Sequence, residues 1–181
     1  MSDSPPLICR PARGGRERED YFALRRAIFC DEQRLFPGDD RDPIDDHAVP
    51  IVCLLGEAAG AAQVIGVVRI WEDAPGEWWG GRLGVESSQR TAGPVGRRLI
   101  QTAVGTARAW GAVRFRATVQ RANVVFFRRL RWRSLEELTL LGQPHHLMEA
   151  DLAAYPPLPQ ARAELRPDGA TYLDSARDHA A

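Results

Sequence analysis

Apolar residues recur at the period of a helix in two stretches of the chain. The first stretch predicts an amphipathic helix over residues 19–33, with apolar positions at Tyr21, Phe22, Leu24, Ile28 and Phe29. The second predicts a helix that begins at Gly93 or Pro94, with apolar positions at Val95, Leu99, Ile100, Ala103, Val104 and Ala107. Proline in its first turn and Gly111 after its last are typical helix boundaries.

Shorter apolar runs, several of them alternating with polar residues, predict strands. We expect strands over residues 7–10, 51–55, 64–71, 78–85, 113–119, 135–141 and 146–152. A Gly/Ala-rich turn between the second and third runs favours an antiparallel hairpin. Residues 12–18 are charged and contain glycine, and residues 35–50 contain three prolines, so we expect both segments to be loops.

The composition excludes several classes of function. The formal net charge is zero, so no global field attracts the chain to nucleic acid or to an anionic membrane. All 24 basic residues are arginine, which excludes Schiff-base chemistry and a Walker-type phosphate lysine. We find no apolar run of membrane-spanning length, no secretory signal pattern and no metal-ligand spacing.

Three cysteines occur, at positions 9, 30 and 53. Their odd number and the lack of C-x-x-C spacing argue against a disulfide framework and against a structural zinc site. A reducing cytoplasm is therefore the expected location. The length predicts one domain with a real core.

The start of the second helix is a candidate anion site. Its first backbone N–H groups have no partner within the helix and lie at the positive end of its dipole, which favours a phosphate. Gly93 and Gly96 let a ligand approach the backbone, and Arg90, Arg97 and Arg98 are able to pair with phosphate oxygens. The alternative is an ordinary strand-to-helix turn with a solvated arginine face.

These residues carry a resemblance to a family. The run Arg82-Leu-Gly-Val85, followed by residues 90–99, resembles the Q/R-x-x-G-x-G/A acyl-CoA motif of the GNAT N-acetyltransferases, although two residues rather than one separate Gly93 from Gly96. Residues 123–132 resemble that family's N-x-x-A-x-x-F-Y-x-x-x-G-F segment. The resemblance covers about residues 7–152.

The resemblance implies an α/β acyl-CoA N-acyltransferase fold, with a mixed, mostly antiparallel sheet of six to seven strands flanked by helices. Residues 1–152 would form this domain, and residues 153–181 a Pro/Ala-rich tail. The donor would be acetyl-CoA or another acyl-CoA, and the Val85 N–H would polarise the thioester carbonyl. The implied donor contacts are Leu83, Gly84, Val85, Arg90, Gly93, Val95, Gly96, Arg97, Asn123 and Phe127.

Proton transfer is less clearly assigned. The family commonly uses a tyrosine as general acid, and the matching residue here is Phe127, which has no proton to donate. Candidates for the base are Glu86, Glu32 and His145, and their spacing selects none of them.

The acceptor is expected to be a small amine. Asp45 and Asp46 belong to an acidic loop that is able to receive a cation, and Trp71 belongs to a tryptophan cluster able to line an acceptor pocket. The alternatives are a solvated acidic loop and simple core packing. The sequence leaves open whether the chain forms a homodimer.

Two other functions remain open. Arg25 or Arg26, Phe29, the pair Asp45-Asp46 and Arg69 resemble acyl-homoserine-lactone synthases of the same fold. This resemblance implies an acyl carrier protein and S-adenosylmethionine as substrates, with Arg69 at the substrate site. Because the tyrosine is missing, a non-catalytic acyl-CoA sensor is the third hypothesis.

Overall fold

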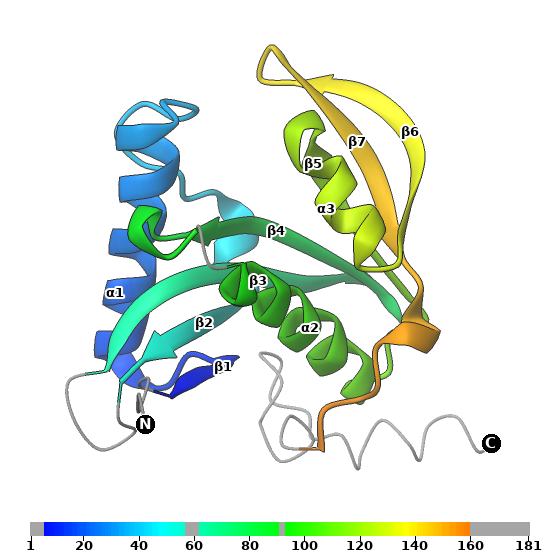
Figure 1. Ribbon diagram of the computed structural model, residues 1–181, viewed down its shortest axis with the longest axis horizontal. Helices are drawn as coiled ribbons and strands as arrows, with labels where there is room; N and C mark the ends of the chain where they lie inside the picture. Colours follow the sequence, from blue (N-terminus) through cyan, green and yellow to red (C-terminus); the bar gives the residue numbers. More distant parts are fainter. Residues whose placement is uncertain (1–5, 57–61, 91–92, 160–181) are drawn as a thin grey trace. The chain divides into compact units, whose positions relative to one another are not determined.

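The computed structural model describes residues 6–56, 62–90 and 93–159 (Figure 1). Seven strands form one sheet in the order β1-β2-β3-β4-β5-β7-β6. The strands are β1 (Leu7–Pro11), β2 (Val49–Leu55), β3 (Gln63–Ala74), β4 (Glu77–Val85), β5 (Arg114–Gln120), β6 (Trp132–Leu140) and β7 (Gln143–Ala150). β4 pairs with β5 in parallel, whereas β1–β2, β5–β7 and β6–β7 are antiparallel. The sheet is the mixed, mostly antiparallel one that the sequence predicted.

The described part of the chain has three α-helices, and the predicted periodicity accounts for the first two. They are α1 (Gly14–Arg26), continued by a π-helical turn (Ala27–Glu32), then α2 (Pro94–Ala109) and α3 (Val124–Arg129). Short 3₁₀ turns occur at Pro43–Asp46, Ser87–Gln89, Arg121–Asn123 and Leu152–Ala154.

Helix α1 begins five residues earlier than the sequence predicted, inside the segment expected to be a loop. Glu17 in its first turn explains the earlier start. Its carboxylate accepts the Arg13 backbone N–H at 2.5 Å and pairs with Arg10 at 2.7 Å. A side chain that satisfies an otherwise unpaired N–H stabilises a helix terminus, even where glycines follow.

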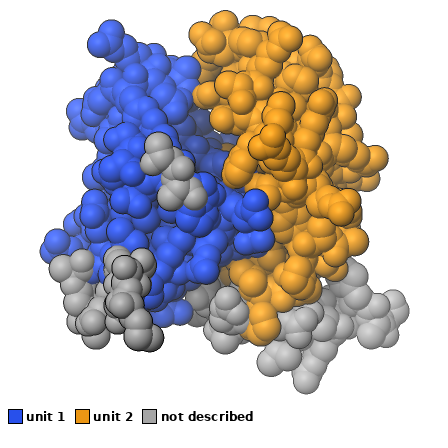
Figure 2. Space-filling view, in the orientation of Figure 1, with its two compact units in different colours: residues 1–69, 82–102 blue, residues 70–81, 103–181 orange. Residues whose placement is uncertain are grey.

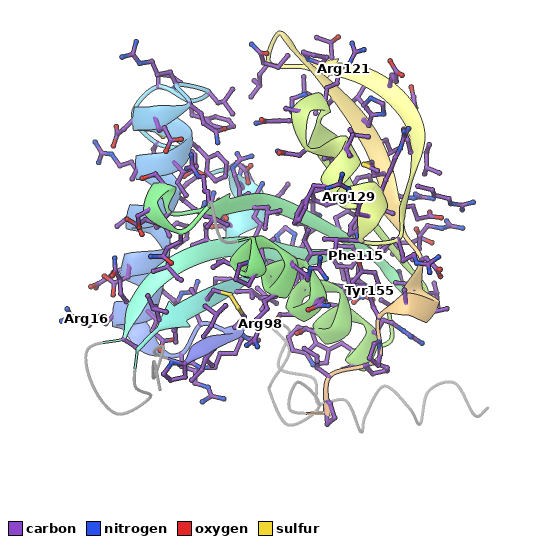
Figure 3. All side chains as sticks on the ribbon, in the orientation of Figure 1. Arg16, Arg98, Phe115, Arg121, Arg129 and Tyr155 are labelled. Atoms are coloured by element: carbon purple, nitrogen blue, oxygen red, sulfur yellow. A yellow bond between two sulfur atoms is a disulfide. The ribbon has the colours of Figure 1, made fainter. Side chains whose placement is uncertain are left out.

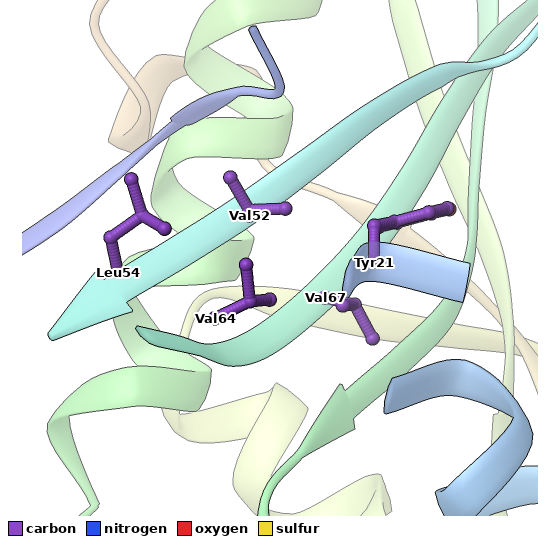
Figure 4. Packing of buried hydrophobic residues seen from close by; sticks show 5 residues of the cluster. All are labelled: Tyr21, Val52, Leu54, Val64 and Val67. Atoms are coloured by element: carbon purple, nitrogen blue, oxygen red, sulfur yellow. The ribbon is translucent and has the colours of Figure 1, made fainter. Parts of the chain in front are cut away.

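The chain divides into two compact units, residues 1–69 with 82–102 and residues 70–81 with 103–181 (Figure 2). In unit 1, apolar side chains from α1, β2 and β3 form a core in which Tyr21, Val52 and Val67 are at most 1 % exposed. Figure 4 shows these three residues with Leu54 and Val64. Side chains of both strands thus pack with Tyr21 of the helix that the apolar spacing predicted.

In unit 2, aromatic residues make the core. Trp132 packs edge-to-face against Phe115 and Phe127, and its indole N–H donates to the Tyr155 hydroxyl at 3.0 Å. The Tyr155 hydroxyl donates in turn to the Leu130 carbonyl (Figure 3 labels Phe115 and Tyr155). Residues 153–159, the start of the predicted tail, therefore pack into this unit through Tyr155, and residues 160–181 of that tail lie outside the described part.

The cysteines correct one expectation from the sequence. Cys9 on β1 lies directly opposite Cys53 on β2, and the two form a disulfide, while Cys30 is free and buried. Figure 3 shows the bond between the two sulfur atoms. Cysteine spacing along the chain does not reveal this pairing, because it depends on strand register, which places residues 44 positions apart side by side.

Candidate functional site

The end of β4 and the start of α2 together form the candidate donor site in unit 1. Arg82 adopts a left-handed backbone (φ 54°) inside β4, a conformation that locally distorts a strand. Gly84 instead allows close packing, since a Cβ there would lie 2.8 Å from the Ile28 Cδ1 atom. Leu83 and Val85 follow Arg82 at the strand's end.

Helix α2 begins at Pro94, directly after Gly93, which has a φ of +71°. The Val95 and Gly96 N–H groups belong to the first turn and so have no acceptor inside the helix. Pro94 supplies no donor of its own. This end of α2 therefore presents backbone donors and a partial positive charge, as the sequence predicted for an anion site.

Gly66 on β3, which the sequence analysis did not select, positions the first turns of α2. A Cβ at this position would lie 2.8 Å from Val95 Cγ1 and 2.9 Å from Leu99 Cδ1. Only glycine therefore lets α2 approach the strand this closely. A glycine inside a predicted strand often marks a place where another part of the chain packs closely against the strand. The sequence contained this signal at Gly66.

The three arginines near this helix start differ in their partners. Arg90 forms a bidentate ion pair with Glu32 and donates to the Val85 carbonyl at 2.8 Å. Arg98 donates to the Leu7 carbonyl at 2.7 Å, and its position on α2 is labelled in Figure 3. Arg97 is exposed and makes no ion pair within the described ranges. Of the three, Arg97 is the guanidinium with donors directed to solvent.

Two of the candidate bases lie beside Arg90. The hydrogen bond from Arg90 lowers the pKa of Glu32, so this carboxylate is ionised at neutral pH. Glu86, just after β4, accepts a hydrogen bond from the Ser88 hydroxyl at 2.7 Å. Arg90 thus pairs directly with Glu32, and the negative charge of Glu86 also acts on it.

The remaining predicted site residues near α3 and β7 belong to unit 2. Asn123 is exposed at the start of α3, and Phe127 is buried against Trp132 with ring centroids 5.1 Å apart. His145 donates through Nδ1 to the Gln143 carbonyl at 2.9 Å. Its neighbour His146 is buried, with Nδ1 2.7 Å from the Ser134 hydroxyl.

The predicted acidic loop of unit 1 is held by arginines. Six side chains form what we call the buried ionic cluster: Arg25, Arg69, Arg82, Asp40, Asp42 and Asp45. Arg25 is fully buried and hydrogen-bonds Asp40 at 2.8 Å and Asp45 at 2.5 Å. Arg69 makes a bidentate pair with Asp42, with both distances 2.7 Å.

Opposite charges balance inside this cluster. Burial acts to raise the pKa of Asp45, but the hydrogen bonds from Arg25 and from the Asp42 backbone N–H outweigh it, and the pKa falls to about 2. A hydrogen bond from Arg69 likewise lowers the pKa of Asp42. The cluster therefore holds three carboxylates against three guanidiniums, and Asp46, outside it, is exposed.

Unit 2 carries a second set of ion pairs, on one face of its strands. Register places Trp79 beside Arg116, Arg116 beside Glu149, and Glu149 beside Arg133. We call the ion-paired side chains the open-face cluster: Arg114, Arg116, Arg133, Glu77 and Glu149. Arg114 and Arg133 are 45 % and 74 % exposed, so this face is open to solvent.

An aromatic pair continues this face. The Trp71 and Trp79 rings stack with centroids 6.4 Å apart and an interplanar angle of 15°, and both are partly exposed. Trp78, one position along, points to the other face and packs against Trp110. Trp71, predicted for the substrate, therefore stands with Trp79 beside the open-face cluster, whereas Trp78 belongs to the core.

Within the ranges that the structure covers, no helix is long and apolar enough to cross a bilayer. The same ranges contain no grouping of histidine, cysteine and carboxylate side chains suited to a metal ion.

Comparison with known proteins identifies the fold. No family model matches the chain, and no curated protein does. Solved structures match over most of its length. A putative N-acetyltransferase from Lactobacillus plantarum matches with a TM-score of 0.69 and 22 % sequence identity. The match covers 83 % of this chain and 99 % of the Lactobacillus chain. An acyl-CoA N-acyltransferase from Pseudomonas aeruginosa matches with a TM-score of 0.63 and 18 % sequence identity. The match covers 81 % of this chain and 99 % of the Pseudomonas chain.

The structure of TofI, solved with an inhibitor and MTA, is also similar, with a TM-score of 0.60, 17 % identity, and 82 % and 95 % of the two chains covered. At these identities the likeness establishes the architecture and not the reaction. This chain has the fold of the GNAT acyl-CoA N-acyltransferases.

Proposed function

We propose that this protein is an N-acyltransferase that moves an acetyl or other acyl group from acyl-CoA to the amine of a small acceptor. One observation carries the proposal: α2 begins at Pro94, right after Gly93, with the Val95 and Gly96 N–H groups unpaired within the helix and Arg97 exposed in the same turn. A helix start of this kind suits the pyrophosphate of CoA. The fold shared with acyltransferases supports the same donor.

In this reaction the neutral amine attacks the thioester carbonyl carbon. A C–N bond forms, the C–S bond breaks and CoA leaves as a thiolate, while the amine loses a proton. The Val85 N–H is the proposed donor to the carbonyl oxygen. Glu86 and Glu32, which flank Arg90, are the proposed bases, with His145 a further candidate. Because Phe127 donates no proton, we expect water to protonate the thiolate.

Calorimetry with CoA tests the donor site. Arg97→Glu should weaken CoA binding about tenfold or more, since it replaces a charge-assisted contact with repulsion. Arg97 is the better probe than Arg90, because changing Arg90 also removes the partner of Glu32.

Arg16→Glu is the matched control. Arg16 lies on α1, is 92 % exposed and is labelled in Figure 3. The control should bind CoA as the unchanged protein does. Equal affinity of the Arg97→Glu variant and the unchanged protein, or no CoA binding by either, would exclude the proposed donor site.

The buried ionic cluster favours a second candidate. Arg25 and Arg69, which resemble positions of acyl-homoserine-lactone synthases, both pair with Asp45, a third such position. Such an enzyme would use S-adenosylmethionine. Thermal unfolding separates the two functions: stabilisation by S-adenosylmethionine and not by acetyl-CoA would favour the second. Thiol release from acetyl-CoA with an amine present would favour the first.

A further inference from the structure

We propose that the acceptor binds on the open sheet face of unit 2, and that it is an aromatic or apolar amine bearing a carboxylate, as an amino acid does. This inference rests on the proposed acyl transfer and names its acceptor class. It places the acceptor on Trp71 and Trp79, with its carboxylate on Arg116. In this proposal the open sheet face, and not the acidic loop, selects the acceptor.

Three carboxylates of the acidic loop do not supply free negative charge. Asp40, Asp42 and Asp45 accept hydrogen bonds from Arg25, Arg69 and Arg82 at 2.5–3.2 Å. An incoming cation would have to displace a guanidinium that is already buried and hydrogen-bonded, which is strongly unfavourable. These three carboxylates are thus neutralised by arginines, and of the loop's two predicted acceptor residues only the exposed Asp46 lies outside the cluster.

The open-face cluster has the opposite character. It contains three guanidiniums and two carboxylates, so one positive charge is left over. Arg116 donates through Nε to Glu149 at 3.1 Å, and its Nη1 is 3.8 Å from Glu77, beyond hydrogen-bond distance. The terminal N–H groups of this planar guanidinium therefore keep donors for a carboxylate, which it is shaped to bind in a bidentate way.

The two indoles define the other half of the acceptor. Trp79 and Arg116 are register partners on adjacent strands, so their side chains are neighbours on one face. The near-parallel Trp71 and Trp79 rings offer a flat, rigid apolar surface to an aromatic or aliphatic group. Together these residues fit a molecule with an apolar body and one anionic group, and they disfavour a polyamine.

Direct binding without donor tests this face. Tryptophan fluorescence and calorimetry would be recorded with L-phenylalanine, with 2-phenylethylamine, which lacks only the carboxylate, and with spermidine. We expect phenylalanine to bind at least about tenfold more tightly than the other two, because charge-assisted hydrogen bonds contribute that much.

Two variants localise the site. Arg116→Gln should remove the preference for phenylalanine over 2-phenylethylamine, and Trp79→Ala should weaken both ligands. Arg128→Gln is the matched control, since this exposed arginine on α3 also belongs to unit 2 and makes no ion pair among the described residues. It should bind phenylalanine normally.

The outcomes separate this inference from the proposed function. If CoA binds but the phenylalanine preference is absent, or survives in Arg116→Gln, the acceptor assignment is wrong and the donor site stands. If phenylalanine binds as expected but CoA does not, the face is a ligand site and the acyl-transfer function fails. Tighter binding of spermidine than of phenylalanine would restore the acidic acceptor site and overturn this inference.

Discussion

The two ionic clusters of this protein use the same residue types in opposite ways. In unit 1, Arg25 and Asp40 are at most 1 % exposed, and each charge has its counter-charge. In unit 2, the open-face arginines Arg114 and Arg133 are largely solvated and one positive charge is in excess. The buried cluster therefore fixes a loop, whereas the solvent-exposed cluster is available to a ligand.

The physical reason lies in desolvation. A buried charge that loses its partner is not solvated by water, so breaking a buried ion pair strongly destabilises the fold. A surface charge that loses its partner is solvated at little cost, so it is free to exchange that partner for a ligand. Each prediction below tests one side of this contrast.

The largest effect is expected from Arg25→Met. The change leaves the buried Asp40 and Asp45 without their shared guanidinium and should lower the free energy of unfolding by about 3–5 kcal/mol. Urea denaturation measures this. Arg26→Met, at the exposed neighbouring position, is the control and should change stability by about 0.5 kcal/mol or less. Similar losses in both variants would show that the cluster is not structural.

Acid should weaken unit 1 through Asp45. Its pKa in the folded protein is about 2, below the unfolded value of about 3.9, so its stabilisation is complete above pH 4 and is lost as the pH falls towards 2. The loss is on the order of 2 kcal/mol. Urea curves from pH 5 to pH 2 should show a flatter pH dependence for Asp45→Asn, and an unchanged slope would contradict the assignment.

The smallest effect is expected from the open-face cluster. Arg133→Gln removes one partner of Glu149, which keeps Arg116, so the free energy of unfolding should fall by less than about 1 kcal/mol. This small difference should shrink further in 0.5 M NaCl, at about a 4 Å Debye length. A loss above about 2 kcal/mol would mean that this cluster, too, is part of the core.

Periodicity predicted most of the fold. The apolar spacing from Val95 to Ala107 predicted α2, and the alternation around Phe115 predicted β5. The start of α1 was missed because Glu17, not an apolar pattern, determines it. Local signals of this kind are weaker than periodicity, so element boundaries are less predictable than elements.

The candidate site was predictable only where its residues are close in sequence. Gly93, Pro94 and Arg97 are neighbours, and the motif around them was visible. The partners Arg25 with Asp45, and Trp79 with Arg116, are separated by 20 and by 37 positions, and only strand register and helix packing bring them together. For the same reason the disulfide escaped prediction.

Gly66 shows how a position without a functional group can still control a ligand site. Because Gly66 has no side chain, β3 and α2 pack closely at this point. Even one added methyl group would contact Val95 too closely. The displaced helix would turn its first N–H groups away from their present direction. The geometry of the proposed donor site is therefore partly encoded by the absence of a side chain on the neighbouring strand.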